Sequence, residues 1–293
     1  MGRLYPRMRE RPAEWRLNPA SPLASGLIFF GGGPGSDGRT YRDAGPFAWH
    51  GRLVGTPHSR LYPYVDFLSR FGLQMHRTSI NYITFGTIPR QWLFLDSAFS
   101  ASIWFFCTYP TGRNRMFECS NSMGAPWPGW TYEVRSASLY TWLGDLAYSR
   151  NEFGGSTTIT ANRWYHGALV FRRAAVAELY LNAKLDGSRD VSNMGDWTHQ
   201  KQAILGNYDP GSYTQNFGGI IADPMLWQRA LTPSEIAALA DPSNVDLRVG
   251  GVPLILPPRR RFWPVAVAEA PPAVQIFSRR QFGPRIGTRQ VQV

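Results

Sequence analysis

The sequence predicts an all-β protein: an antiparallel two-sheet jelly-roll sandwich with one short C-terminal helix and extended N- and C-terminal arms. Three observations indicate this fold class. Short apolar runs of strand length recur along the chain, no long helical period interrupts them, and turn-forming residues stand between many of them. A closed two-sheet arrangement also hides its edges and buries aromatic residues, which make up 14% of this chain.

The 293 residues divide into a folded domain and two arms. We place the domain at residues 23–247, an Arg/Pro-rich N-terminal arm at 1–22 and a Pro/Arg-rich C-terminal arm at 248–293. One all-β domain of about 200–250 residues is ordinary. A chain of this length buries roughly 70–75% of its unfolded surface, so no cross-link is needed to hold it.

Predicted strands and turns follow one another through the first half of the domain. The run from Leu23 to Phe30 is the first strand, and the glycine-rich residues 31–38 are expected to form a loop. No Lys-Ser or Lys-Thr pair follows these glycines, so a P-loop is excluded. Further strands are expected at 71–75, 80–85, 99–106, 116–119, 131–134 and 139–143.

In the second half, apolar runs at 164–171, 178–185 and 203–206 are further strand candidates. The stretch from Phe217 to Asp241 then reads as a closing strand, a turn and one short helix. Thr232, Pro233 and Glu235 have the spacing of a capping box with proline in the first helical turn. Asp241 and the proline after it are expected to end the helix.

Three motifs occur in a recognisable order along the chain. The first is Asp43 with His50-Gly51, and the second is Trp164-x-His166 with the later Leu179-Tyr180-x-Asn182. The third, near the C-terminal end of the domain, consists of Ile220, Ile221, Asp223, Trp227, Arg229, Ala230, Leu231, Thr232, Glu235, Ile236 and Leu239. These motifs and their order resemble laminin-G-like domains, which have a concanavalin A-like jelly roll, and the resemblance covers about residues 23–241.

At one position the chain departs from the resembled pattern. Ala183 stands where related sequences have the glycine of an Asn-Gly turn. Such a turn requires positive φ, which alanine resists. We therefore expect the turn here to be shifted or longer.

The net charge of +11 lies mainly in the arms. Residues 1–20 carry five Arg and two Glu, and residues 248–293 carry eight Arg and one Glu. Residues 21–247 are therefore close to neutral. Lys184 and Lys201 are the two lysines of the chain, and Arg suits protein interfaces as well as phosphates.

This charge distribution leads to our first functional hypothesis, a non-enzymatic virion structural protein. We expect a bacteriophage capsid decoration or tail-associated protein, assembled in the host cytoplasm, homo-oligomeric and bound to other virion subunits through its arms. The resemblance to laminin-G-like proteins of bacteriophage structural modules points the same way. The candidate partner-binding residues are Arg259, Arg260, Arg261, Phe262, Trp263, Arg279 and Arg280.

Two alternatives remain open. The resemblance to a lectin-like fold implies a carbohydrate-binding adhesin, in which aromatic rings beside loops stack on sugar CH groups. The candidate platform consists of Trp127, Trp130 and Trp142, with Tyr140 and Tyr148 nearby. Nucleic-acid binding through the arginine-rich arms ranks behind a protein partner, because the arginines are spread among proline and apolar residues.

Catalytic and metal-binding patterns are weak in this sequence. The Glu-x-Asp-x-x-Glu string of related glucanases does not occur, and we expect Glu118, Glu133, Glu152 and Glu178 to be isolated from one another. His166 is expected to be structural. We expect no cofactor; the candidates for a Ca²⁺ site at a sheet rim are Asp186, Asp190 and Asp209.

The remaining sequence features bear on the compartment. No signal peptide is visible, because the first 20 residues are polar and broken by proline. No apolar run reaches the roughly 18 residues of a membrane span. We expect Cys107 and Cys119 to be buried free thiols, although a bridge across a hairpin stays open.

Overall fold

The computed structural model describes residues 16–34, 39–55, 63–65, 71–77, 81–86, 97–120, 128–145, 147, 150–195, 202–207, 215–244 and 247–249. The predicted arms fall mostly outside these ranges, so the division into one domain and two arms stays a prediction. No helix in the described part of the chain combines the length and the apolar character needed to cross a membrane.

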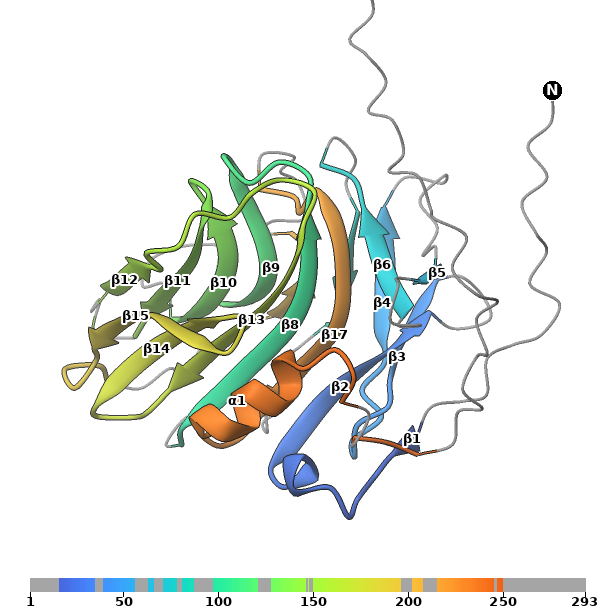
Figure 1. Cartoon of the computed structure of the whole chain (residues 1–293), viewed down its shortest axis with the longest axis horizontal. Coiled ribbons are helices and arrows are strands. Elements are labelled where there is room, and N and C mark those ends of the chain that lie inside the picture. Colours follow the sequence, from blue (N-terminus) through green and yellow to red (C-terminus); the bar gives the residue numbers. More distant parts are fainter. Residues whose placement is uncertain are drawn as a thin grey trace, which may run out of the picture. The chain divides into compact units, whose positions relative to one another are not determined.

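The first layer of the sandwich is built from antiparallel strands (Figure 1). They are β5 (Pro63–Val65), β6 (Phe71–Met75), β8 (Phe99–Cys107), β13 (Trp164–Phe171), β14 (Val176–Leu181), β15 (Lys184–Asp190) and β17 (Gly219–Trp227). Their order is β15, β14, β13, β8, β17 and β6, with β5 beyond β6.

The second layer is also antiparallel. It contains β3 (Thr40–Asp43), β4 (Gly51–Gly55), β7 (Asn81–Thr84), β9 (Arg113–Ser120), β10 (Gly129–Arg135), β11 (Ser138–Gly144), β12 (Arg150–Gly154) and β16 (Gln202–Leu205). Their order is β12, β11, β10, β9, β16, β7, β4 and β3. The predicted jelly-roll sandwich is therefore confirmed.

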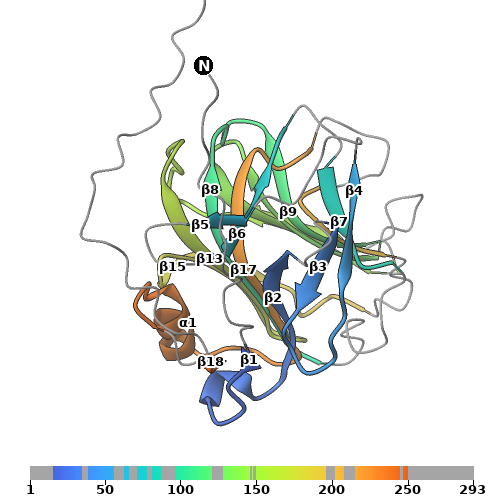
Figure 2. The same ribbon diagram turned by 90° about the vertical axis from the view of Figure 1, so that its right-hand side faces the viewer.

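One strand, β2 (Leu27–Pro34), belongs to both layers. Its first half pairs with β17 and its second half with β3. Figure 2 shows β2 between these two strands. At the opposite edge, the Ser156 amide donates to the Asp186 carbonyl oxygen at 2.9 Å and joins the residues after β12 to β15. Both edges of the sandwich are thus held by hydrogen bonds.

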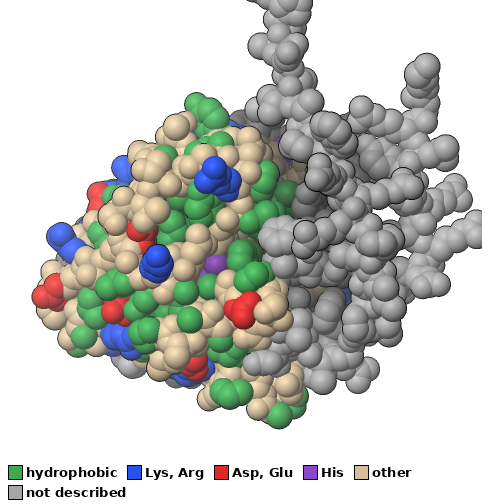
Figure 3. Space-filling view, in the orientation of Figure 1, with side chains coloured by type: hydrophobic (Ala, Val, Ile, Leu, Met, Phe, Trp, Pro, Cys, Tyr) green, Lys and Arg blue, Asp and Glu red, His purple; other side chains and the backbone are tan. Residues whose placement is uncertain are grey.

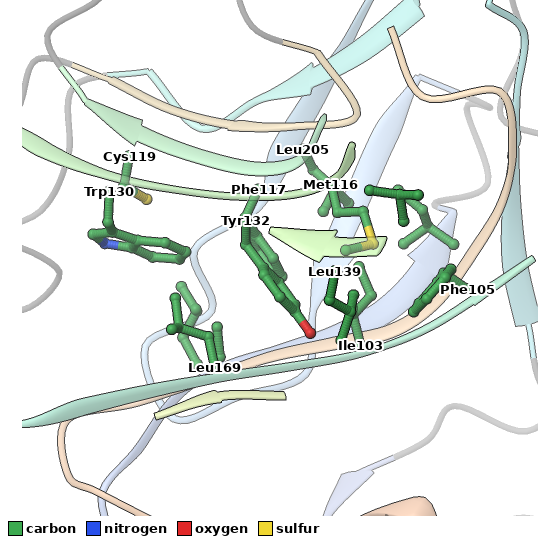
Figure 4. Packing of buried hydrophobic residues seen from close by; sticks show 14 of the residues in the cluster. Ile103, Phe105, Met116, Phe117, Cys119, Trp130, Tyr132, Leu139, Leu169 and Leu205 are labelled. Atoms are coloured by element: carbon green, nitrogen blue, oxygen red, sulfur yellow. The ribbon is translucent and has the colours of Figure 1, made fainter. Parts of the chain in front are cut away.

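The hydrophobic core fills the space between the layers (Figure 4). Because side chains alternate along a strand, β10 turns Trp130 and Tyr132 inward and its polar residues outward. The rings of Trp130 and Phe99, from opposite layers, lie 5.0 Å apart. Phe105 of β8 and Leu169 of β13 add further side chains from the first layer to the same core. Burying one such side chain stabilises the fold by about 1.5–3 kcal/mol.

A second apolar cluster lies under the helix α1 (Pro233–Ala240), which covers the outer face of the first layer (Figure 1). The predicted capping box is confirmed. Thr232 Oγ1 accepts from the Glu235 amide at 3.3 Å, and Glu235 Oε2 accepts from the Thr232 amide at 2.8 Å. Two hydrogen bonds from Arg229, at 2.6 and 2.9 Å, lower the pKa of Glu235 to about 2.

Asp43 and His50 brace the turn between β3 and β4 with hydrogen bonds. Asp43 carboxylate oxygens accept from the amides of Phe30 at 2.9 Å, Gly45 at 2.7 Å and Trp49 at 2.7 Å. The Asp43 amide in turn donates to Nδ1 of His50 at 3.1 Å. This carboxylate therefore fixes the connection from β2 through β3 toward β4. Burial raises the pKa of Asp43, even though these three amides oppose the shift.

The prediction for the first strand is wrong at both of its ends. Residues Pro22–Ala24 form a 3₁₀ turn, and β2 begins at Leu27 and continues through Gly31, Gly32 and Gly33, which were expected to lie in a loop. Glycine serves as a strand residue there because of close packing. A Cβ at Gly31 would lie 2.3 Å from Tyr41 Oη and 2.6 Å from Pro224 Cγ.

The prediction of a shifted or longer turn near Ala183 is also wrong. Leu181 pairs with Lys184, so Asn182 and Ala183 form a two-residue turn between β14 and β15. Both have positive φ, 49° for Asn182 and 69° for Ala183. Alanine accepts the left-handed conformation at a cost of about 1–2 kcal/mol, which the surrounding ladder offsets.

The two cysteines are free and buried in the core, as predicted. Burial raises the pKa of Cys107 to about 11 and that of Cys119 well above its usual value. At the described limits of the arms, β1 (Arg16–Leu17) pairs with β18 (Arg248–Val249). The chain therefore enters and leaves the described fold side by side.

Candidate functional site

Half-exposed aromatic rings lie on the outward side of β11. Tyr140 and Trp142 are two residues apart on this strand, so their side chains share one face, while Leu139, Thr141 and Leu143 are buried. This placement fits the predicted sugar platform in part. We call the set Arg135, Tyr140, Trp142, Arg150 and Glu152 the aromatic face.

The structure does not place the other two tryptophans predicted for the platform, Trp130 and Trp127, on this face. Trp130 points inward and is fully buried, so the prediction that it forms part of an exposed platform is wrong. Strand alternation explains this, because the Trp130 side of β10 faces the core and the Thr131 side faces outward next to Trp142. Trp127 lies outside the described residues.

Charged groups frame both rings of the aromatic face. The Arg135 guanidinium carbon lies 4.5 Å from the Tyr140 ring centroid, and that of Arg150 lies 5.9 Å from the Trp142 centroid. Both guanidinium groups reach the same carboxylate oxygen of Glu152, at 3.3 and 3.2 Å. The face therefore combines apolar ring surface with hydrogen-bond donors and one acceptor.

A hydrogen bond between Glu152 and Tyr140 shifts the pKa of both side chains. Partial burial acts to raise the pKa of Glu152, but a hydrogen bond from Tyr140 and the charge of Arg150 outweigh it and lower the pKa. The pKa of Tyr140 is raised by burial and then by its bond to Glu152. At neutral pH Glu152 is therefore an anion and Tyr140 a neutral donor.

A buried carboxylate cluster lies beside the aromatic face on β9 and β10. Glu133 accepts from Arg113 at 3.1 Å and from Arg115 at 2.9 Å, and Arg115 also bonds Glu118. The prediction that Glu118 and Glu133 are isolated from one another is wrong. Residues distant in sequence meet because Arg115 and Glu133 are cross-strand partners.

Both carboxyl groups of this cluster are fully buried. Burial raises the pKa of Glu118 to about 7, against the opposing charge of Arg115 and a hydrogen bond from Ser120. A raised carboxyl pKa is also a property of general acids. Here, however, Arg and Ser side chains bond the carboxylate oxygens of Glu118, and neither Glu118 nor Glu133 is exposed to a substrate.

His166 occupies a structural position, as predicted. It is fully buried on β13, its Nε2 lies 2.8 Å from Ser102 Oγ, and its ring packs 5.4 Å from the Trp104 ring. Ser102 is equally buried. This Ser–His pair is therefore closed to substrate.

The Ca²⁺ candidates do not converge in the described residues. Asp186 is buried, and its Oδ1 accepts from the Thr157 amide at 2.9 Å and Ser156 Oγ at 3.3 Å. Asp190 is exposed and accepts from the Ser192 amide at 2.8 Å. Asp209 lies outside the described residues. Nowhere in the part of the chain that the structure describes do three His, Cys, Asp or Glu side chains gather as metal ligands.

The candidate arm residues cannot be placed, because they all lie outside the described residues: Arg259, Arg260, Arg261, Phe262, Trp263, Arg279 and Arg280. On the described surface in Figure 3, basic and acidic side chains are scattered among apolar and uncharged ones. This distribution agrees with the nearly neutral sequence between the arms.

The profile of the concanavalin A-like lectin/glucanases superfamily matches residues 79–237, more than half of the chain. The chain belongs to this superfamily. The matched region includes β8 to β17, and with them the aromatic face and the buried carboxylate cluster. A comparison with curated proteins gave no match.

Solved structures with the same fold include binding domains of toxins. The binding domain of Paraclostridial Mosquitocidal Protein 1 is 18% identical over 74% of this chain and 52% of its own, with a TM-score of 0.58. The binding domain of botulinum neurotoxin DC, solved with rat synaptotagmin II, is 14% identical over 74% and 52%, with a TM-score of 0.56. At these identities the likeness concerns the fold alone, and this chain spans about half the length of those structures.

The sequence pattern does not predict the charged members of the aromatic face. Arg135, Arg150 and Glu152 come from β10 and β12, the two strands beside β11, and the sequence pattern predicts no strand at residues 150–154. Strand alternation in residues 138–144 was the available signal, since it places Tyr140 and Trp142 on one side. The neighbours of these rings depend on cross-strand register, which the sequence does not specify.

Proposed function

We propose that this chain is a lectin-like binding protein that recognises a glycan through the aromatic face. The observation that carries this proposal is the pair of half-exposed rings on one side of β11, framed by two guanidinium groups and an ionised carboxylate. Sugars present slightly positive CH groups, which pack on the negative face of an aromatic ring, and hydroxyl groups, which bond to charged side chains.

The comparisons support a binding role. The superfamily includes lectins, and the solved neighbours are toxin binding domains. One neighbour was solved in complex with N-acetylneuraminic acid, and the report of another describes interaction with two ganglioside molecules. These ligands are properties of those proteins, and they make a glycan the first ligand class to test here.

A binding role is also supported over a catalytic one. The paired carboxylates, Glu118 and Glu133, are buried and bonded to Arg and Ser side chains. A glycosidase needs its acid and its nucleophile or base open to the sugar. The superfamily's glucanase chemistry is therefore not part of the proposal.

The proposal is tested with a glycan array followed by titration calorimetry on the sugars that bind. Trp142→Ala should weaken binding at least about tenfold, which corresponds to about 1.4 kcal/mol. Trp164→Ala is the matched control, because Trp164 is a half-exposed tryptophan on the other layer. Equal affinity of the wild type and Trp142→Ala, or no sugar bound at millimolar concentration, would refute the assignment.

The virion structural role is our second candidate, favoured by a nearly neutral domain between basic arms. The comparisons favour the lectin-like role, so we rank the virion role second. Its location in the virion and its contacts with other subunits remain part of this second proposal. Arginine-rich arms would gain order on partner subunits, where Arg–carboxylate bonds offset the loss of chain entropy. Deletion of residues 248–293 should then abolish incorporation into a particle; full incorporation of the truncated chain would exclude this role.

A further inference from the structure

One nitrogen of an arginine side chain is buried without a hydrogen-bond acceptor in the described part of the chain. Arg77 follows β6 and is itself half-buried, and its buried Nη1 donates to no oxygen there. The ion pairs among the described residues involve other arginines. A buried charged donor without an acceptor is rare, because desolvation is not compensated.

The group is nevertheless well positioned. The Arg77 guanidinium carbon lies 4.0 Å from the centroid of the Tyr109 ring. The guanidinium also lies against Gly112, where a Cβ would come within 2.5 Å of Nη2 and 2.7 Å of Nη1. Nδ2 of the buried Asn114 donates to the carbonyl oxygens of Tyr109 at 2.8 Å and Gly112 at 3.3 Å, which fixes this turn.

This geometry suits an incoming oxyanion. The guanidinium carbon of Arg77 lies over the Tyr109 ring, and the paired N–H donors of a guanidinium group match two oxygens of a carboxylate or a sulfate. Tyr109 is 52% exposed, so its ring can contact the rest of the ligand while Arg77 binds the anionic group. The cation and the ring form one recognition unit.

We propose that Arg77 and Tyr109 form an oxyanion subsite for an acidic glycan, one that carries a carboxylate or a sulfate ester. This inference rests on the proposed function, which makes a glycan the ligand. The turn that carries Tyr109 contacts the turn before β11, because the Ala137 amide donates to the Pro110 carbonyl oxygen at 2.8 Å. The subsite therefore adjoins the strand that bears the aromatic face.

The test measures the affinity of the full chain for three oligosaccharides of equal length: oligogalacturonate, a sulfated oligogalactan and a neutral oligogalactan. The acidic oligosaccharides should bind more tightly than the neutral one. Arg77→Met should weaken the acidic complexes at least about tenfold and leave neutral binding within about twofold. Loss confined to the carboxylate or the sulfate ligand identifies the group that is bound.

Two further variants separate recognition from general charge effects. Gly112→Ala places a methyl group against the guanidinium and should weaken acidic binding in the same way as Arg77→Met. Arg189→Met removes an exposed arginine elsewhere and should change nothing. Equal loss in Arg77→Met and Arg189→Met, or equal affinity of the wild type for acidic and neutral ligands, would overturn the subsite.

A stability measurement separates a binding role from a structural one. The melting temperature of Arg77→Met should stay close to that of the wild type, because the buried Nη1 has no acceptor among the described residues whose loss would cost stability. A large decrease would mean that Arg77 supports the fold, and would overturn the proposal. If Trp142→Ala abolishes all glycan binding while Arg77→Met changes none, the proposed function stands without the subsite; the reverse result keeps the subsite and removes the aromatic face.

Discussion

Glu118 should make the folded state less stable as the pH rises from 5 to 7.5. Burial raises the pKa of this carboxyl from its usual 4.5 to about 7, although the Arg115 charge and the Ser120 hydroxyl oppose the shift. Between these two values the folded chain binds a proton that the unfolded chain has released. Stability from this group is therefore complete below pH 4.5 and is lost as the pH rises through 7.

The magnitude follows from the two pKa values. A difference of one pKa unit between the folded and the unfolded state changes the free energy of unfolding by about 1.4 kcal/mol. Integrated from pH 5 to 7.5 with pKa values of about 7 and 4.5, the expected loss is about 2 kcal/mol. The variant Glu118→Gln abolishes this contribution, because the amide has nearly the same shape and no titrating proton.

The assay is urea unfolding at pH 5, 6 and 7.5. The free energy of unfolding of the wild type should fall by about 2 kcal/mol more than that of Glu118→Gln over this range. Glu152→Gln is the control; the pKa of Glu152 is lowered, so it is ionised throughout and its loss should leave the pH dependence unchanged. Parallel curves for wild type and Glu118→Gln would refute the reasoning.

Three further substitutions test local structure. Ala183→Gly relieves a φ of 69° and should stabilise the chain by about 1 kcal/mol, seen as a melting temperature about 2–4 °C higher; no increase would contradict the left-handed turn. Thr232→Ala removes the hydroxyl that accepts from the Glu235 amide and should cost about 1 kcal/mol in urea unfolding, and Thr232→Ser clearly less; an equal cost would argue against the cap. Asp43→Asn directs an amide group at backbone donors and should cost about 2 kcal/mol, whereas unchanged unfolding would show that the brace is dispensable.

Local signals in the sequence predicted much of the fold. The run at 164–171 gave β13 with the observed bounds, and the capping box gave the start of α1. Both depend on neighbours within a few residues, such as strand alternation or a side chain three positions away. β12 escaped prediction because its sequence, Arg150 to Gly154, has no apolar alternation.

The candidate site was harder to predict because it depends on register. Trp130 stands beside a loop in sequence, but it alternates with the polar Thr131 and Glu133 along β10, and this alternation places its side chain in the core. The turn between β10 and β11 is a different case. Its two residues, Ser136 and Ala137, have positive φ of 51° and 61°, which neither residue type signals.

The pairing of β1 with β18 has a consequence for engineering. Arg16 and Val249 are partners across this ladder, so their Cα atoms stand only about 5 Å apart. The two ends of the region from Arg16 to Val249 are therefore adjacent in space. Insertion of residues 16–249 into a surface loop of another protein would therefore leave the two ends of that loop close together. A circular permutant that joins residues 16 and 249 would need a linker of only a few residues.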